Sequence, residues 1–200
     1  MPAILITGLS GTGKSSALHE LARLGHRTVD TDEDGWCEWA QTEYGPGWVW
    51  REDRMTALLE GHTEGTLYVS GCLSNQGRFY PQFSAVVLLS APRKLMLHRL
   101  ATRTTNPYGK RADERQLVLE QLATVEPLLR ATATVEIDTS KPLAEVVAEL
   151  VERGAGGRPS PWPWAARVTT WRTLRPVGEG TRPPASSRRP SPNSSPWPAA

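Results

Sequence analysis

The sequence predicts an α/β fold with a mostly parallel five-stranded sheet. Its first apolar run, residues 3–7, is unbroken, as expected of a strand that is buried on both faces. This run leads directly into a glycine-rich turn and then into a stretch with the period of a helix. Further along, short apolar runs keep alternating with helical stretches, which favours parallel strands connected by helices. A chain of 200 residues has room for one such domain.

The predicted elements extend from the N-terminus to about residue 153. Strands are expected at 3–7, 27–30, 67–70, 85–89 and 132–137, and helices at 14–24, 51–60, 93–103, 112–130 and 142–152. The segment at 33–65 is too long for a bare crossover and contains four tryptophans, so it departs from a minimal α/β unit. Residues 103–112 are polar, basic and rich in turn formers, which predicts a mobile loop.

Composition divides the chain near Arg153. Residues 1–153 contain 16 Lys and Arg against 20 Asp and Glu, whereas residues 154–200 contain seven Arg, one Glu and ten of the 17 prolines. Such a tail cannot offset its ordering entropy by burying surface, so it is expected to be disordered. Its arginines and four tryptophans could contact nucleic acid. Because the charges are scattered among prolines, we favour a solvated linker and do not expect a nucleic-acid partner.

Several protein classes are excluded by the sequence. No apolar run approaches the ~18 residues of a membrane span, and the first residues lack the pattern of a signal peptide. The cysteines Cys37 and Cys72 have no CxxC spacing, and the four histidines form no metal-binding pair. A protein of the reducing cytoplasm, without a membrane partner, is expected.

Residues 8–15, Gly-Leu-Ser-Gly-Thr-Gly-Lys-Ser, match the phosphate-binding pattern G-x-x-x-x-G-K-[ST] in full. In this pattern the loop N–H groups surround phosphate oxygens, the lysine reaches the β- and γ-phosphates, and the hydroxyl binds Mg²⁺. The helix that follows directs the positive end of its dipole at the same anion. The sequence therefore predicts a P-loop with ATP and Mg²⁺ as its cofactors. The expected phosphate-binding residues are Gly8, Ser10, Gly11, Thr12, Gly13, Lys14, Ser15 and Ser16, with Ser15 also on the metal.

Two carboxylates follow the strand predicted at 27–30, in Asp30-Thr31-Asp32. We expect this strand to lie beside the P-loop strand, which would place both carboxylates next to the phosphates at the carboxyl edge of the sheet. Alternate residues of an extended segment point the same way, so both could face the cleft. Asp30 is then a candidate metal ligand, and Asp32 a candidate proton acceptor for an attacking hydroxyl. The alternative is that the acidic residues only begin a helix.

Together these features resemble the nucleoside monophosphate kinase and shikimate/gluconate kinase group of P-loop proteins, over about residues 2–152. The resemblance implies a three-layer P-loop NTPase fold. It also implies transfer of the γ-phosphoryl group of ATP to a small metabolite or a nucleoside monophosphate. Residues 33–65 would be the substrate lobe and residues 103–112 the lid. Because the strand at 67–70 has no aspartate after it, the resemblance points to the shikimate/gluconate branch.

The same resemblance assigns roles to four arginines. Arg99 and Arg103 would be lid arginines that neutralise charge on the transferred phosphoryl group. Arg54 in the lobe and Arg78 after the third strand would bind the acceptor, together with Asp30 and Asp32. The alternative that remains open is a nucleotide-dependent ATPase or switch with no small-molecule acceptor. The residues leave the acceptor and the oligomeric state open.

Overall fold

The computed structural model describes residues 1–33, 35–42 and 45–156. Its centre is a parallel sheet of five strands in the order β2-β5-β1-β6-β7. The strands span Ala3–Thr7 (β1), Arg27–Asp30 (β2), Leu67–Ser70 (β5), Ala85–Ser90 (β6) and Val135–Asp138 (β7). A separate antiparallel hairpin is formed by β3 (Cys37–Thr42) and β4 (Gly45–Trp50). The predicted fold class is confirmed.

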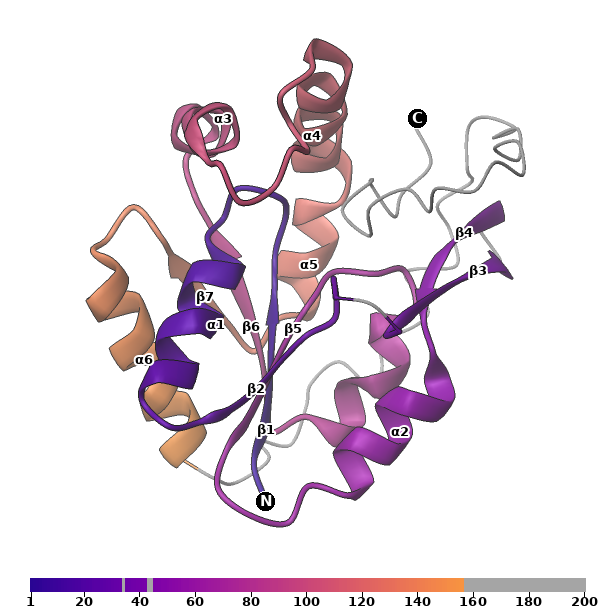
Figure 1. Ribbon diagram of the computed structural model, residues 1–200, viewed down its shortest axis with the longest axis vertical. Helices are drawn as coiled ribbons and strands as arrows, with labels where there is room; N and C mark the ends of the chain where they lie inside the picture. Colours follow the sequence, from indigo (N-terminus) through magenta and orange to yellow (C-terminus); the bar gives the residue numbers. More distant parts are fainter. Residues whose placement is uncertain (34, 43–44, 157–200) are drawn as a thin grey trace.

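Helices cover both faces of the sheet and the edge where its strands end (Figure 1). One face is covered by α1 (Lys14–Arg23) and α6 (Leu143–Ala155). The other face is covered by α2 (Glu52–Glu60), the 3-10 helix η1 (Gln76–Gln82) and α5 (Glu126–Thr132). Beyond the carboxyl ends of the strands lie α3 (Arg93–Thr102) and α4 (Ala112–Thr124), next to the loop that connects β1 to α1.

The core follows from the alternation of side chains along each strand. In β1, which is buried over its whole length, Ile4 and Ile6 pack against α1 and α6. Ala3 and Leu5 pack on the opposite face with α2 and η1. A third cluster of buried apolar side chains packs α3, α4 and α5 against the sheet. The loops at the carboxyl edge of the sheet therefore begin and end in well-packed strands and helices.

Four details differ from the sequence-based expectations. The single helix expected at 112–130 is interrupted at Val125, where Pro127 falls in the first turn of a new helix. The last strand begins at Val135, because α5 continues to Thr132. The lobe at 33–65 contains the β3–β4 hairpin, which the sequence did not predict. The strand β2 does not lie beside the P-loop strand, because β5 separates the two.

The end of the domain also differs slightly from its expected position. Helix α6 runs to Ala155, two residues past the expected boundary. Residues 157–200, which make up nearly all of the predicted tail, lie outside the described residues. No helix in the described ranges is long and apolar enough to cross a membrane.

Candidate active site

The loop between β1 and α1 has the conformation that its glycines permit. Gly8, Gly11 and Gly13 all have positive φ. At Gly8 a Cβ atom would lie 2.4 Å from the carbonyl oxygen of Leu89, so only glycine fits there. The Lys14 ammonium donates hydrogen bonds to the carbonyls of Gly8 (2.7 Å) and Leu9 (3.2 Å). Its charge is therefore held over the loop.

A cavity of about 460 Å³ opens above this loop, within the usual size range for small-ligand sites. Its walls come from the P-loop, from Asp32, from the end of α3 with the loop that follows, and from the segment between β7 and α6. The structure thus brings the four predicted catalytic residues to one cavity: Lys14, Asp32, Arg99 and Arg103. The cavity also contains Ser10, Gly11, Gly13, Ser15 and Ser16.

Asp30 reaches the P-loop helix even though β2 and β1 are not neighbours. Helix α1 crosses the sheet and packs against β2, which brings its N-terminus to the end of that strand. The Ser15 hydroxyl donates to Asp30 Oδ2 at 3.3 Å, and the Asp32 N–H donates to Asp30 Oδ1 at 3.1 Å. A hydroxyl and a carboxylate are oxygen donors of the kind that Mg²⁺ prefers.

This pair suits a magnesium ion that takes its remaining ligands from phosphate and water. Among the described residues there is no cluster of three or more His, Cys, Asp or Glu side chains that could hold a metal by itself. A magnesium ion on Ser15 and Asp30 would therefore take its other ligands from nucleotide phosphates and water.

Asp32 has the most perturbed acidity in the cavity. Its pKa is raised from 3.8 to about 6, mainly because the carboxyl is buried, and the charge of Asp30 adds to the effect. The cations Lys14 and Arg103 act in the opposite direction. A carboxylate of this pKa is mostly ionised at neutral pH and still basic enough to take a proton. The alternative of an acidic helix start is wrong, because the element that follows β2 is the strand β3 and not a helix.

The two predicted lid arginines occupy different parts of the cavity wall. The Arg99 guanidinium donates to the Thr139 hydroxyl (2.9 Å) and carbonyl (2.7 Å), and to the Gly11 carbonyl at 3.4 Å. Arg103 follows the last residue of α3 and donates to the Tyr108 carbonyl at 2.7 Å. Its Nε is buried and has no hydrogen-bond partner among the described residues. Burial also lowers the pKa of Arg103.

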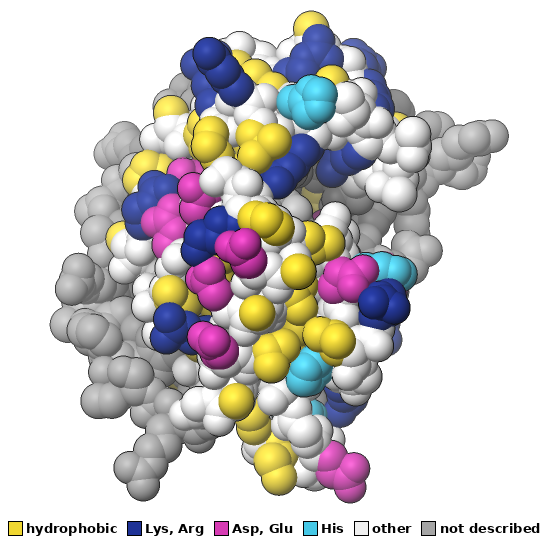
Figure 2. Space-filling view, turned by 90° about the vertical axis from the view of Figure 1, so that its left-hand side faces the viewer, with side chains coloured by type: hydrophobic (Ala, Val, Ile, Leu, Met, Phe, Trp, Pro, Cys, Tyr) yellow, Lys and Arg dark blue, Asp and Glu magenta, His cyan; other side chains and the backbone are white. Residues whose placement is uncertain are grey.

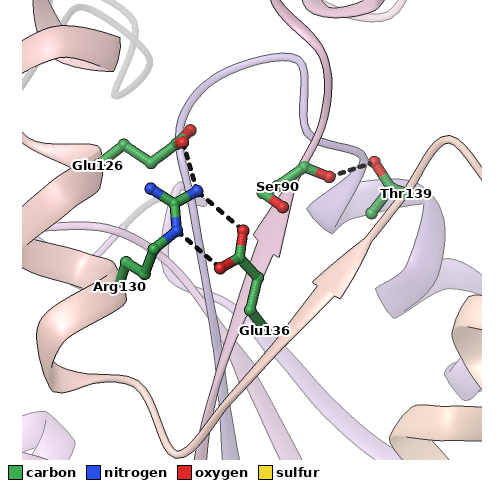
Figure 3. Close-up of polar contacts among 5 residues, drawn as sticks. All are labelled: Ser90, Glu126, Arg130, Glu136 and Thr139. Carbon is green, nitrogen blue, oxygen red and sulfur yellow. Dashed lines mark hydrogen bonds and ion pairs between the residues drawn. The ribbon is translucent and has the colours of Figure 1, made fainter.

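Polar contacts hold β7 and the adjoining Thr139 against β6 and α5 (Figure 3). The Thr139 hydroxyl donates to the Ser90 carbonyl at 3.0 Å. Beside it, Arg130 of α5 forms two hydrogen bonds with Glu136 of β7, at 2.7 and 2.8 Å, and one with Glu126 at 2.7 Å. These contacts tie α5 to β7, and they were not predicted from the sequence.

The loop predicted as a lid is held together by its own charged side chains. The Lys110 ammonium donates to the carbonyls of Ala101 and Arg103, both at 2.6 Å, and closes the end of α3. Arg115 donates to the Lys110 carbonyl at 2.5 Å, and the Glu114 carboxylate accepts the Gly109 N–H at 2.7 Å. Figure 2 shows Lys and Arg side chains gathered at this end of the molecule. Part of this charge therefore stabilises the shape of the loop itself.

Arg54 and Arg78, the predicted acceptor-binding arginines, do not line the cavity. Arg54 donates to the Gly35 carbonyl at 2.7 Å, and its guanidinium carbon lies 4.8 Å from the ring centre of Trp36. Arg78 forms an exposed ion pair with Glu52. Arg54 belongs to the segment 33–65 itself, and Arg78 contacts that segment at the first residue of α2.

Comparisons with known proteins agree with this architecture. A family model described as an AAA domain matches residues 4–120. Shikimate kinase from Acinetobacter baumannii, solved in complex with shikimate, is 22% identical, with 76% of this chain and 92% of that chain covered and a TM-score of 0.52. For shikimate kinase from Bacteroides thetaiotaomicron the identity is 19%, the coverage 76% and 97%, and the TM-score 0.53.

No curated protein sequence matches the chain. The structural likeness confirms the predicted resemblance to the fold of the P-loop small-molecule kinases. The family match covers more than half of the chain, from the first residues of β1 into α4. The chain belongs to the AAA domain family.

Proposed function

We propose that the protein is a kinase that transfers the γ-phosphoryl group of ATP to a hydroxyl group of a small metabolite. The observation that carries this proposal is the partly buried carboxylate of Asp32 in the same cavity as Lys14, Ser15 and Arg103. A hydroxyl acceptor needs a base, whereas a phosphate acceptor is already an anion. The raised pKa of Asp32 therefore favours a hydroxyl over a nucleoside monophosphate.

The P-loop would bind the phosphates through the backbone of residues 8–16, with Thr12 held inside the loop by its bond to the Leu9 carbonyl. Lys14 would exchange its contacts with the loop carbonyls for the β- and γ-phosphates. Ser15 and Asp30 would hold Mg²⁺, which neutralises charge on the phosphates when it is bound.

In the transfer step, Asp32 accepts the proton of the acceptor hydroxyl while the hydroxyl oxygen forms a bond to the γ-phosphorus. The bond between that phosphorus and the oxygen bridging to the β-phosphate breaks, and ADP leaves. Arg103, whose Nε has no hydrogen-bond partner within the described part of the chain, and Arg99 would offset the negative charge on the transferred group.

The acceptor would lie between Asp32 and the lobe formed by residues 33–65. Arg54 and Arg78 point to an acceptor that also carries an anionic group, provided that they release Gly35 and Glu52. Shikimate, the ligand of the A. baumannii kinase, has hydroxyl groups and a carboxylate. We therefore expect a small hydroxylated acid or a molecule of similar polarity.

The test is to incubate the protein with MgATP and a library of metabolites and to look for one that gains the mass of one phosphoryl group. Asp32→Asn should lower the rate of that transfer by about 10²–10⁴-fold while ATP still binds. If no metabolite is phosphorylated and ATP is hydrolysed at the same rate with all of them, the kinase proposal fails.

A further inference from the structure

Thr31, the residue between the two candidate carboxylates, is fully buried. Its N–H and its hydroxyl both donate to the Ser70 carbonyl, at 2.9 and 2.8 Å. The hydroxyl oxygen accepts a hydrogen bond from the indole Nε1 of Trp50 at 2.9 Å. The Thr31 carbonyl accepts one from the Cys37 thiol at 3.0 Å. Thr31 is thus fixed by three segments at once, namely β5, β4 and β3.

Trp50, the last residue of the hairpin, is itself fixed. Its indole is fully buried. Its backbone N–H donates to the Asn75 side-chain oxygen, and its carbonyl accepts from the Asn75 amide nitrogen, both at 2.9 Å. A double contact of this kind holds both position and direction. Any shift of the hairpin would therefore be passed to Thr31.

Gly71 leaves no room for this arrangement to relax. A Cβ atom at this position would lie 2.0 Å from the Thr31 hydroxyl oxygen and 3.0 Å from the Trp50 ring. The backbone after β5 thus touches both partners of the buried hydrogen bond. Such close packing allows one arrangement of the segment rather than several.

The two carboxylates beside Thr31 are held differently. The Asp30 carboxylate accepts hydrogen bonds from Ser15 and from the Asp32 N–H. No described residue donates a hydrogen bond to the Asp32 carboxylate, so the hydrogen bonds that hold this residue in place are those of the backbone at residues 31 and 32. We infer that Thr31 and Trp50 are positioning residues, which aim Asp32 at the acceptor and couple its position to the β3–β4 hairpin. This inference rests on the proposed role of Asp32 as the base.

The experiment compares variants of the full chain in the slow hydrolysis of MgATP, with water as the acceptor. Thr31→Val keeps the shape and removes the hydroxyl, Thr31→Ser restores the hydroxyl, and Asp32→Asn removes the base. Tyr68→Phe is the matched control, because it deletes another buried hydroxyl, which donates to the Leu150 carbonyl at 3.3 Å on the α6 side of the sheet.

We expect Thr31→Val to lower kcat by about 10–100-fold, since small displacements of a reacting group cost this much. The KM for MgATP should stay within about twofold, because the P-loop is untouched. Thr31→Ser should recover most of kcat, and Tyr68→Phe should leave it unchanged. In NMR spectra the indole N–H signal of Trp50 should shift in Thr31→Val and exchange faster with solvent.

The inference is overturned if Thr31→Val melts at a lower temperature but has the same kcat as the control Tyr68→Phe. The hydrogen bond between Thr31 and Trp50 would then contribute to stability alone. If Asp32→Asn leaves hydrolysis unchanged, the base assignment is wrong and the positioning role falls with it. The Trp50 signal would still change in that case, which separates the two failures. If Thr31→Val does not fold, Trp50→Phe removes the same hydrogen bond from the other side and must lower kcat without a comparable change in KM.

Discussion

Replacing Asp32 with asparagine should stabilise the fold at neutral pH, even though it removes the proposed base. The side chain is partly buried just after β2, and this loss of contact with water is the main reason why its pKa is raised. An ionised carboxylate in such a place costs folding free energy that a neutral amide of the same shape avoids. Sites of this kind often exchange stability for activity.

The size of the effect follows from the pKa of Asp32, which is about 6 in the folded chain against 3.8 ordinarily. Because the folded pKa is the higher one, the folded state binds the proton more tightly than the unfolded state does. The wild-type chain therefore loses stability as the pH rises from about 4 to about 6. The loss amounts to about 3 kcal/mol, or roughly 6–12 °C in melting temperature for a domain of this size.

The assay is urea unfolding of wild type and Asp32→Asn, followed by tryptophan fluorescence, between about pH 4 and pH 8. Wild type and Asp32→Asn should have similar free energies of unfolding near pH 4. Above about pH 6 the free energy of unfolding should be higher for the variant. The control is Asp53→Asn on the exposed surface of α2, where Arg51 lowers the pKa of the carboxyl, so no gain with rising pH is expected. A difference in stability between wild type and Asp32→Asn that does not change with pH would show that the charge of Asp32 does not destabilise the fold.

Three further predictions concern turnover and nucleotide binding. Lys14→Ala should weaken ATP binding in calorimetry and abolish turnover, because it removes the positive charge that would contact the β- and γ-phosphates. Turnover at the wild-type rate would contradict the P-loop assignment. Arg103→Ala should lower the transfer rate much more than the ATP affinity, unlike Arg111→Ala, whose guanidinium is paired with an exposed carboxylate. The transfer rate should rise about tenfold per pH unit below pH ~6 and level off above it, and this rise should disappear in Asp32→Asn.

Local signals account for what the sequence predicted correctly. The apolar run of β1, the glycine pattern and the period of α1 lie within about 20 residues of one another, and they correctly indicated a strand, a loop and a helix. The order of the strands in the sheet depends on pairing between residues far apart in the sequence. Consecutive strands are usually neighbours, and the expected position of β2 beside β1 followed that tendency. The structure instead inserts β5 between them, through pairings that join residues about 40 and 60 positions apart.

The hairpin and the polar contacts of the site could not be predicted for related reasons. Gly45, Pro46 and Gly47 look like a turn, yet they form part of β4, where Pro46 lies opposite Gln41 in a two-stranded ribbon. The bond between Trp50 and Thr31 joins residues 19 positions apart, and the bond between Arg99 and Thr139 joins residues 40 positions apart. No spacing rule in one sequence links such positions.

The strand order also determines when the P-loop can form during synthesis. Leu5 of β1 has Val69 and Val86 as its partners, so both neighbours of the P-loop strand are made long after it. At ~5–20 residues per second, the ribosome needs several seconds to extend the chain from β1 to β6. During that interval the apolar β1 has no sheet to join, and its non-local pairings make closure of the sheet slow. The proposed nucleotide site can therefore form only after the first 90 residues have been synthesised, because β6 ends at Ser90.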